Sequence, residues 1–288
     1  MGSFISTFIS PPPLPPLPPL PPRPSIDDLP ENCIALMYMK LDAVDVCRLA
    51  GLSRAFWGAA SADFVWESKL PDNYGFLVRK LFDEVPERLR KMDVYSMLSR
   101  PIRFDAATKE IWLDKSTGKM CMAISWKGMR ITGIDDRRYW SHLPSDESRF
   151  HVIAYLQQVW WLEVSGELEF TFPVGSFGLF FRLQKGKPTN RNGRRACNLD
   201  QVHGWDSKPL RFELSASNGQ HAVSQWFLKQ TGNWGYYHVG EFTVENPNTP
   251  FRIKYSMSQI DCTHTKGGLC LDSVVICPCE LKERLLEL

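Results

Sequence analysis

Residues 161 to 170 read Trp-Leu-Glu-Val-Ser-Gly-Glu-Leu-Glu-Phe, and this stretch decides the class of fold. Large apolar side chains alternate with glutamate and serine along most of it. Successive side chains of a β-strand point to opposite faces, so the alternation predicts a strand with one buried and one solvated face. Such half-buried strands are typical of antiparallel sheets.

Similar short runs, rich in β-branched and aromatic residues and separated by Gly, Asn, Asp and Pro, continue on both sides of this stretch. We expect strands at residues 121–126, 158–164, 167–172, 177–183, 210–214, 222–227 and 236–244. A helical turn is expected near residues 150–156. No internal repeat is evident, which disfavours propellers and solenoids. The sequence therefore predicts an all-β sandwich, similar to a jelly roll, over residues 102–279, followed by a short tail at residues 280–288.

The segment from residue 29 to residue 66 carries helix signals instead. Pro30 suits a first helical position, because that position needs no N–H donor, and apolar residues then recur at helical spacing as far as Leu41. Asp42 and Ser53 are predicted N-caps of a second and a third helix. Three short helices bury little surface by themselves, so we expect this module to pack on the rest of the chain or to dock on a partner.

A helical linker is predicted between this module and the sandwich, at residues 73–101. One helix is expected from Tyr74 to Phe82. A second is expected to begin at Pro86 and to end before Pro101, because proline favours the first turn of a helix and disfavours its interior.

The N-terminal helices also carry a recognisable order of residues. The segment opens Leu29-Pro30-Glu31, continues through Leu52-Ser53-Arg54 and closes Val65-Trp66-Glu67. In this order and spacing it resembles the F-box, which we place at residues 26–72. The resemblance implies a non-catalytic substrate-recognition subunit of an SCF-type (Skp-cullin-F-box) ubiquitin ligase, docked on a Skp-type adaptor and through it on a cullin-RING ligase. The adaptor-binding residues that it implies are Leu29, Pro30, Ile34, Leu41, Leu49 and Leu52.

A second set of blocks lies in the predicted sandwich. They are Ile111-Trp112-Leu113-Asp114, Tyr139-Trp140, Val159-x-Trp161-Leu162-Glu163-Val164-x-Gly166 and Gly267-Gly268-Leu269. In this order they resemble the plant phloem protein 2 lectins, the Nictaba-type carbohydrate-binding family, and an F-box followed by this domain is a known plant architecture. The resemblance implies that targets are chosen by glycans, particularly oligosaccharides that contain N-acetylglucosamine.

A sugar site needs aromatic rings that stack on the pyranose and a few polar groups that bind its hydroxyls. The candidates are Trp112, Trp126, Asp135, Tyr139 and Trp140. The chain departs from the family at Gly133, where the family has a tryptophan. For the pair Trp160-Trp161, alternation predicts that one of the two rings faces the core.

Three alternatives stand beside this interpretation. In the first, the chain is a lectin that acts without a ligase. In the second, its β-domain binds proteins independently of glycans. The third is an enzyme. A glycosidase would use Glu163, Glu167 and Glu169, since residues two apart on a strand share a face. We interpret these carboxylates as solvent-facing strand positions and predict no enzyme activity.

Composition argues against several other classes of protein. The net charge of +2 argues against a dedicated nucleic-acid-binding protein, and no stretch approaches the roughly 20 apolar residues of a membrane span. The cysteines Cys262, Cys270, Cys277 and Cys279, with His264, lack the spacing of a zinc site. We therefore predict no metal and no cofactor, free thiols, and a location in the nucleus and/or the cytoplasm.

The first 25 residues differ from the rest of the chain. Residues 11–24 are nearly all proline and leucine, which favours an extended, disordered arm. Met1-Gly2 with Ser6 fits the N-myristoylation pattern, which makes Gly2 a candidate lipidation site. A single acyl chain at Gly2 supports only weak membrane association.

Overall fold

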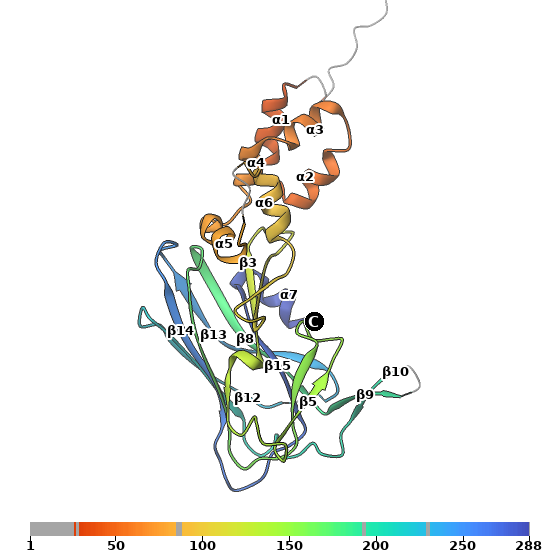
Figure 1. The fold of residues 1–288 in the computed structure, drawn as a ribbon, viewed down its shortest axis with the longest axis vertical. Coiled ribbons are helices and arrows are strands. Elements are labelled where there is room, and N and C mark those ends of the chain that lie inside the picture. Colours follow the sequence, from red (N-terminus) through yellow and green to blue (C-terminus); the bar gives the residue numbers. More distant parts are fainter. Residues whose placement is uncertain (1–25, 27–28, 85–87, 192–193, 229–230, 288) are drawn as a thin grey trace, which may run out of the picture.

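The computed structural model describes residues 26, 29–84, 88–191, 194–228 and 231–287. Helices occupy the N-terminal part and antiparallel β-sheets the remainder, as Figure 1 shows. The helices before the sheets are α1 (Glu31–Tyr38), α2 (Ala43–Leu49), α3 (Arg54–Ala60), α4 (Asp63–Glu67), α5 (Tyr74–Leu81) and α6 (Lys91–Leu98). None of the described helices is long and apolar enough to cross a membrane. The predicted proline-rich arm and Gly2 lie outside the described residues.

The predicted helix starts in the N-terminal module are largely confirmed. The Asp42 carboxylate accepts a hydrogen bond from the backbone N–H of Asp45 at 2.7 Å, which caps α2. The Ser53 hydroxyl likewise accepts from the N–H of Phe56, which caps α3. Each bond satisfies an amide that the first turn of a helix leaves without a partner.

The start predicted for the second linker helix is wrong. Helix α6 begins at Lys91, five residues after Pro86. Two polar contacts fix this start: the Asp63 carboxylate accepts from the N–H of Lys91 at 3.0 Å, and Arg90 pairs with Asp93. A side chain from α4 therefore decides where α6 begins, and local sequence does not show it.

The predicted linker is firmly packed at both of its ends. On the sandwich side, the Phe76 ring meets the edge of Phe170 at 5.3 Å, and the buried Asn73 amide donates to the Thr171 carbonyl at 2.7 Å. On the helical side, Tyr95 of α6 packs on Trp66 at 5.4 Å. One continuous hydrophobic core consequently runs from α1 into the sheets.

The β-domain consists of two sheets with a core between them. The larger sheet has the order β1 (Ile102–Phe104), β2 (Lys109–Leu113), β3 (Met120–Ser125), β15 (Leu269–Pro278), β6 (Val152–Leu156), β5 (Trp140–Pro144), and β15 also pairs with β8 (Gly175–Lys185), which pairs with β13 (Trp234–Val244). The smaller sheet has the order β12 (His221–Trp226), β11 (Leu210–Ala216), β14 (Phe251–Gln259), β7 (Leu162–Phe170), β4 (Arg130–Ile131). Rings from the two sheets meet in the core, for example Phe181 with Phe212 at 5.5 Å. The remaining elements are the hairpin β9 (Lys187–Arg191) and β10 (Arg194–Asn198), the 3-10 turns η2 (Trp126–Gly128) and η3 (Cys279–Leu281), and α7 (Lys282–Leu286).

Two strands predicted around Gly166 form the single strand β7. Glycine usually weakens a strand, but here Tyr255 of β14 lies directly across from Gly166 and its ring covers the position where a Cβ would stand. An aromatic ring from the partner strand therefore replaces the missing side chain, and β7 continues without a break.

Other expectations for the β-domain are wrong. Residues 152–156, expected to be a helical turn, form β6 between β5 and β15. Strands β14 and β15 were not predicted from the sequence, although β15 is buried along its whole length at the centre of the larger sheet. An apolar run buried on both faces loses the alternation that marks a strand.

The cysteines of β15 belong to this buried strand. Cys270 and Cys277 are both buried, and burial raises the pKa of each thiol. Among the described residues, no group of three or more His, Cys, Asp or Glu side chains is placed to hold a metal ion.

We predict that Gly166→Ala destabilises the fold by about 1–3 kcal/mol, because the added methyl group overlaps the Tyr255 ring and the core must shift. Urea unfolding followed by tryptophan fluorescence measures the change. Gly75→Ala on α5 is the control, since a Cβ there meets only the Arg79 side chain at an ordinary 3.6 Å. Equal stability of the two variants would contradict the packing of Tyr255 over Gly166.

Candidate functional sites

Large apolar side chains are exposed on α1 and α3 and in the turns beside the first three helices. Leu52 is 66% exposed and Trp57 is 64% exposed, although residues of this kind are usually buried. Leu29, Leu36 and Met37 are also exposed. We call this set the helical end; Figure 1 places α1 and α3 far from the sandwich.

The predicted adaptor-binding residues divide by burial. Leu29, Pro30 and Leu52 are exposed, whereas Leu41 and Leu49 are half-buried. Ile34 is only 1% exposed, because it lies on the face of α1 that packs against α3. A side chain buried in its own module offers no surface to a partner, so Ile34 holds α1 in place instead.

Sequence reasoning left Leu36 and Trp57 out of the predicted site. The helical period of the sequence does place both residues away from the buried face of their helices. Leu36 lies two positions from Ile34 and so falls on another face of α1, and Trp57 follows the buried Phe56 on α3.

The predicted sugar-binding aromatics are mostly packing residues. Trp140 is buried and its indole N–H donates to the Thr132 carbonyl at 3.0 Å. Trp126 is also buried and lies 4.5 Å from the His142 ring. Rings without an exposed face cannot stack on a sugar.

Trp112 is separated from the rest of the predicted set. It lies on β2 and packs against the buried cluster of Cys121, Phe180 and Cys277, whereas Trp126 and Trp140 belong to the main hydrophobic core. The Arg149 guanidinium covers its ring at 4.0 Å. Only Asp135 and Tyr139 remain exposed in the predicted block.

The tryptophan pair between β6 and β7 contradicts the sequence expectation. Trp160 is 56% exposed and Trp161 is 46% exposed, so neither ring is in the core. Their neighbours Val159 and Leu162 take the buried positions instead. The alternation does not apply here because Trp160 and Trp161 precede β7.

A buried lysine holds this pair in place. The Lys266 ammonium donates to the carbonyls of Trp160 and Asp261, each at 2.5 Å, and the backbones of Lys266 and Val159 exchange two bonds of 2.8 Å. Burial lowers the pKa of Lys266. The carbonyls thus compensate for the charge that the fold removes from water.

Tyr139 reaches the same end of the sandwich. The backbone N–H of Gln157 donates to the Tyr139 carbonyl at 2.7 Å, and the Gln157 amide donates to the Arg137 carbonyl. The two loops that carry Tyr139 and the tryptophan pair are therefore tied together. We call Tyr139, Trp160 and Trp161 the loop end.

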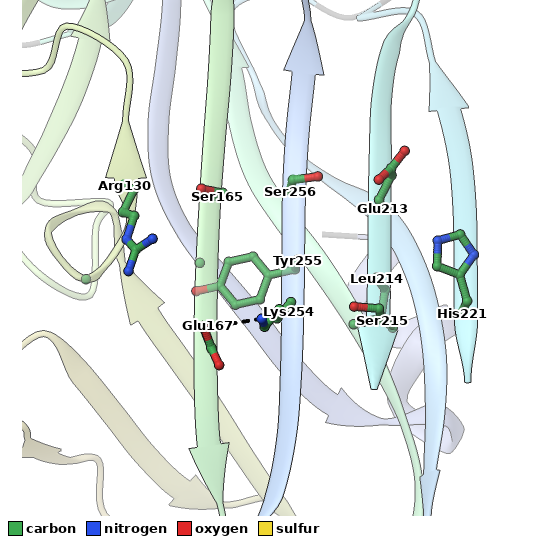
Figure 2. Close-up of a pocket in the computed structure, with 12 residues that line it drawn as sticks. Arg130, Ser165, Glu167, Glu213, Leu214, Ser215, His221, Lys254, Tyr255 and Ser256 are labelled. Atoms are coloured by element: carbon green, nitrogen blue, oxygen red, sulfur yellow. Dashed lines mark ion pairs between the residues drawn. The ribbon is translucent and has the colours of Figure 1, made fainter. Parts of the chain in front are cut away.

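A groove of about 460 Å³ crosses the outer face of the smaller sheet. Figure 2 shows polar side chains from β4, β7, β14, β11 and β12 along it. The lining residues are Gly128, Arg130, Ser165, Gly166, Glu167, Glu213, Leu214, Ser215, His221, Lys254, Tyr255 and Ser256. None of the residues in the predicted sugar site lines this groove.

The three carboxylates considered for glycoside hydrolysis are exposed on this same face. Glu167 pairs with Lys254 at 3.8 Å, and Glu169 pairs with Arg252. Glu163 accepts a long bond of 3.4 Å from the Trp161 indole. All three carboxylates are exposed to solvent on the strand, as the alternation predicts.

Comparison with known proteins agrees with this organisation. Residues 119–278 match the family model described as "Phloem protein 2". The chain is 57% identical to the F-box protein PP2-A13 and 55% identical to the F-box protein PP2-A12 of Arabidopsis thaliana, each over 90% of both chains. The chain belongs to the plant F-box proteins of the phloem protein 2 family. It is also 33% identical to the Arabidopsis F-box protein PP2-B10, over 49% of this chain and 50% of the relative.

The phloem protein 2 match covers the loop end and the groove but not the helical end. Both β-domain surfaces are therefore parts of the phloem protein 2 region. The exposed apolar helices lie outside this region. The two Arabidopsis relatives match 90% of this chain, which is far more than the phloem protein 2 region alone.

We predict that Lys266→Met destabilises the protein by about 2–3 kcal/mol, because the carbonyls of Trp160 and Asp261 lose a charged donor while they stay shielded from water. Thermal unfolding measures the loss, and quenching of tryptophan fluorescence by acrylamide should increase as the pair is released. Lys208→Met is the control, since Lys208 is largely exposed. Equal effects of the two substitutions would contradict the role of Lys266.

Proposed function

We propose that this chain is the non-catalytic, substrate-recognition subunit of an SCF-type ubiquitin ligase. The helical end docks on a Skp-type adaptor and the phloem protein 2 domain recognises the target. The observation that carries the proposal is the exposure of Leu52, Trp57 and Leu36 in a member of the F-box family. A few residues supply most of the affinity of a protein interface, and tryptophan is prominent among them.

The packed linker supports this division of labour. Because α5 is anchored on Phe170 and α6 on Trp66, the helical end and the β-domain hold a fixed relation. A ligase subunit with this design presents a bound target in a defined direction from the adaptor. We further propose that it works in the nucleus or the cytoplasm, where such ligases act.

For target recognition we propose that the loop end binds glycans. Tyr139, Trp160 and Trp161 are exposed on two loops that a backbone bond from Gln157 ties together, and sugar stacking needs exposed aromatic rings. In this proposal Trp126 and Trp140 support the loops from below, and Asp135 is the remaining exposed polar residue of the predicted block.

We predict that Leu29→Ala combined with Pro30→Ala, and separately Trp57→Ala, weaken adaptor binding about 30-fold or more, the effect of losing an interface hot spot. Copurification with co-expressed adaptor and biolayer interferometry measure the change. Thermal stability should stay the same, because these side chains are exposed. Phe227→Ala, an exposed ring of the β-domain, is the control, and wild-type adaptor binding in all variants would contradict the proposal.

We predict that a glycan array probed with the full chain gives specific signals that Trp161→Ala and Tyr139→Ala reduce, since a lost stacking ring costs about 1–3 kcal/mol. Trp161→Phe should retain binding because it keeps a ring face. Trp140→Ala should instead lower stability by about 3–5 kcal/mol, as expected for a buried ring. A blank array with well-folded protein would leave a domain that recognises protein surfaces alone.

A further inference from the structure

The strand register places two rows of polar side chains across the groove. In the first row, Arg130 stands opposite Ser165, which stands opposite Ser256. Ser256 in turn stands opposite Glu213, so the row ends in a carboxylate. Figure 2 shows these four residues at one level of the sheet. A cation and an anion therefore lie at opposite ends, with two small hydroxyl side chains between them.

The second row lies two residues further along β7 and β14. The register aligns Glu167 with Lys254, Lys254 with Ser215, and Ser215 with His221. Glu167 and Lys254 pair with each other at 3.8 Å. The opposite charges of Glu167 and Lys254 thus offset each other, and the first row is left as the more selective one.

The first row has unused hydrogen-bonding capacity. Within the part of the chain that the structure describes, no carboxylate pairs with the Arg130 guanidinium, and the hydroxyls of Ser165 and Ser256 make no hydrogen bond. The Glu213 carboxylate is held by Arg211 of its own strand at 2.6 Å, but the pair is exposed, and exposed pairs exchange partners at little cost.

The groove lacks the feature that a sugar site needs. Tyr255 is the only Phe, Tyr or Trp residue among the described lining residues, and its ring is buried beneath Gly166; the other ring is the imidazole of His221 on the edge strand β12. No Phe, Tyr or Trp ring face is offered for stacking, whereas both signs of charge are. Serine side chains in the middle of the row leave space for a main chain to approach the sheet. These properties favour a polar peptide over an oligosaccharide.

The spacing of the charges defines the peptide. Arg130 and Glu213 are separated by three strand spacings, or about 14 Å. An extended chain advances about 3.4 Å per residue and returns to the same face at every second residue. Side chains four residues apart therefore match both the distance and the face.

We propose that the groove binds an extended segment of the ubiquitylation target, in which an acidic side chain on Arg130 and a basic side chain on Glu213 stand four residues apart. This inference rests on the proposed role of the β-domain in target recognition. It assigns the groove to polypeptide and leaves the loop end as a separate surface.

The test uses the full chain and fluorescein-labelled decapeptides of serine and glycine that carry one Asp and one Lys at separations of two, four or six residues. Fluorescence anisotropy should show the tightest binding at a separation of four, by about fivefold over the others and over an Asn/Gln peptide at that separation. Equal binding of all these peptides, or none by any, overturns the proposal.

Charge reversal then locates the site. Arg130→Glu and Glu213→Lys should each weaken the best peptide about fivefold, and a peptide with Lys at both positions should recover binding to Arg130→Glu. Lys208→Glu, outside the groove, should change nothing. Unchanged binding in both groove variants overturns the assignment.

Two further readouts separate this proposal from the others. Adaptor copurification should be normal in Arg130→Glu, so that failure of the groove is distinguished from failure of the ligase role. Binding of an N-acetylglucosamine hexasaccharide that disappears in Arg130→Glu, with no binding of the peptides, would assign the groove to sugar and overturn the peptide proposal.

Discussion

The antiparallel pairing of β7 with β14 is the interaction on which the other parts of the structure depend. It places Leu162, Val164 and Leu168 in the core and sets the polar residues between them on the outer face. A slip by one residue would exchange the two faces, so burial of the apolar set fixes the register. The same register aligns the charges across the groove.

Strand β7 also relates the three candidate surfaces to one another. Its C-terminal residue Phe170 receives the helical linker through Phe76, whereas its first residue follows the exposed tryptophan pair. The nine residues of the strand span about 30 Å, so the helical end and the loop end lie on opposite sides of the sandwich. The helical end and the loop end are therefore surfaces that do not compete for space.

The tryptophans of the β-domain differ in burial, and their roles differ accordingly. Trp126 and Trp140 have indole N–H groups that bond to backbone carbonyls, and they fill the interior. Trp160 and Trp161 belong to a loop whose carbonyls are bound by Lys266, which leaves their rings outside. The difference arises from contacts with residues more than a hundred positions away, such as Lys266, and not from the tryptophans themselves.

The sequence by itself determined the order of a helical module before a β-domain, the caps at Asp42 and Ser53, and the half-buried strand β7, because these depend on local hydrogen bonds and side-chain alternation. It did not reveal β15, whose burial on both faces removes the alternation, nor the start of α6, which a carboxylate of α4 decides. It identified Leu29, Leu52 and Tyr139 as surface residues of interest but could not separate them from the buried Ile34 and Trp140. Only the tertiary structure decided which of these residues are exposed and where the groove lies. Exposure and cross-strand register arise when distant segments of the chain pack against one another.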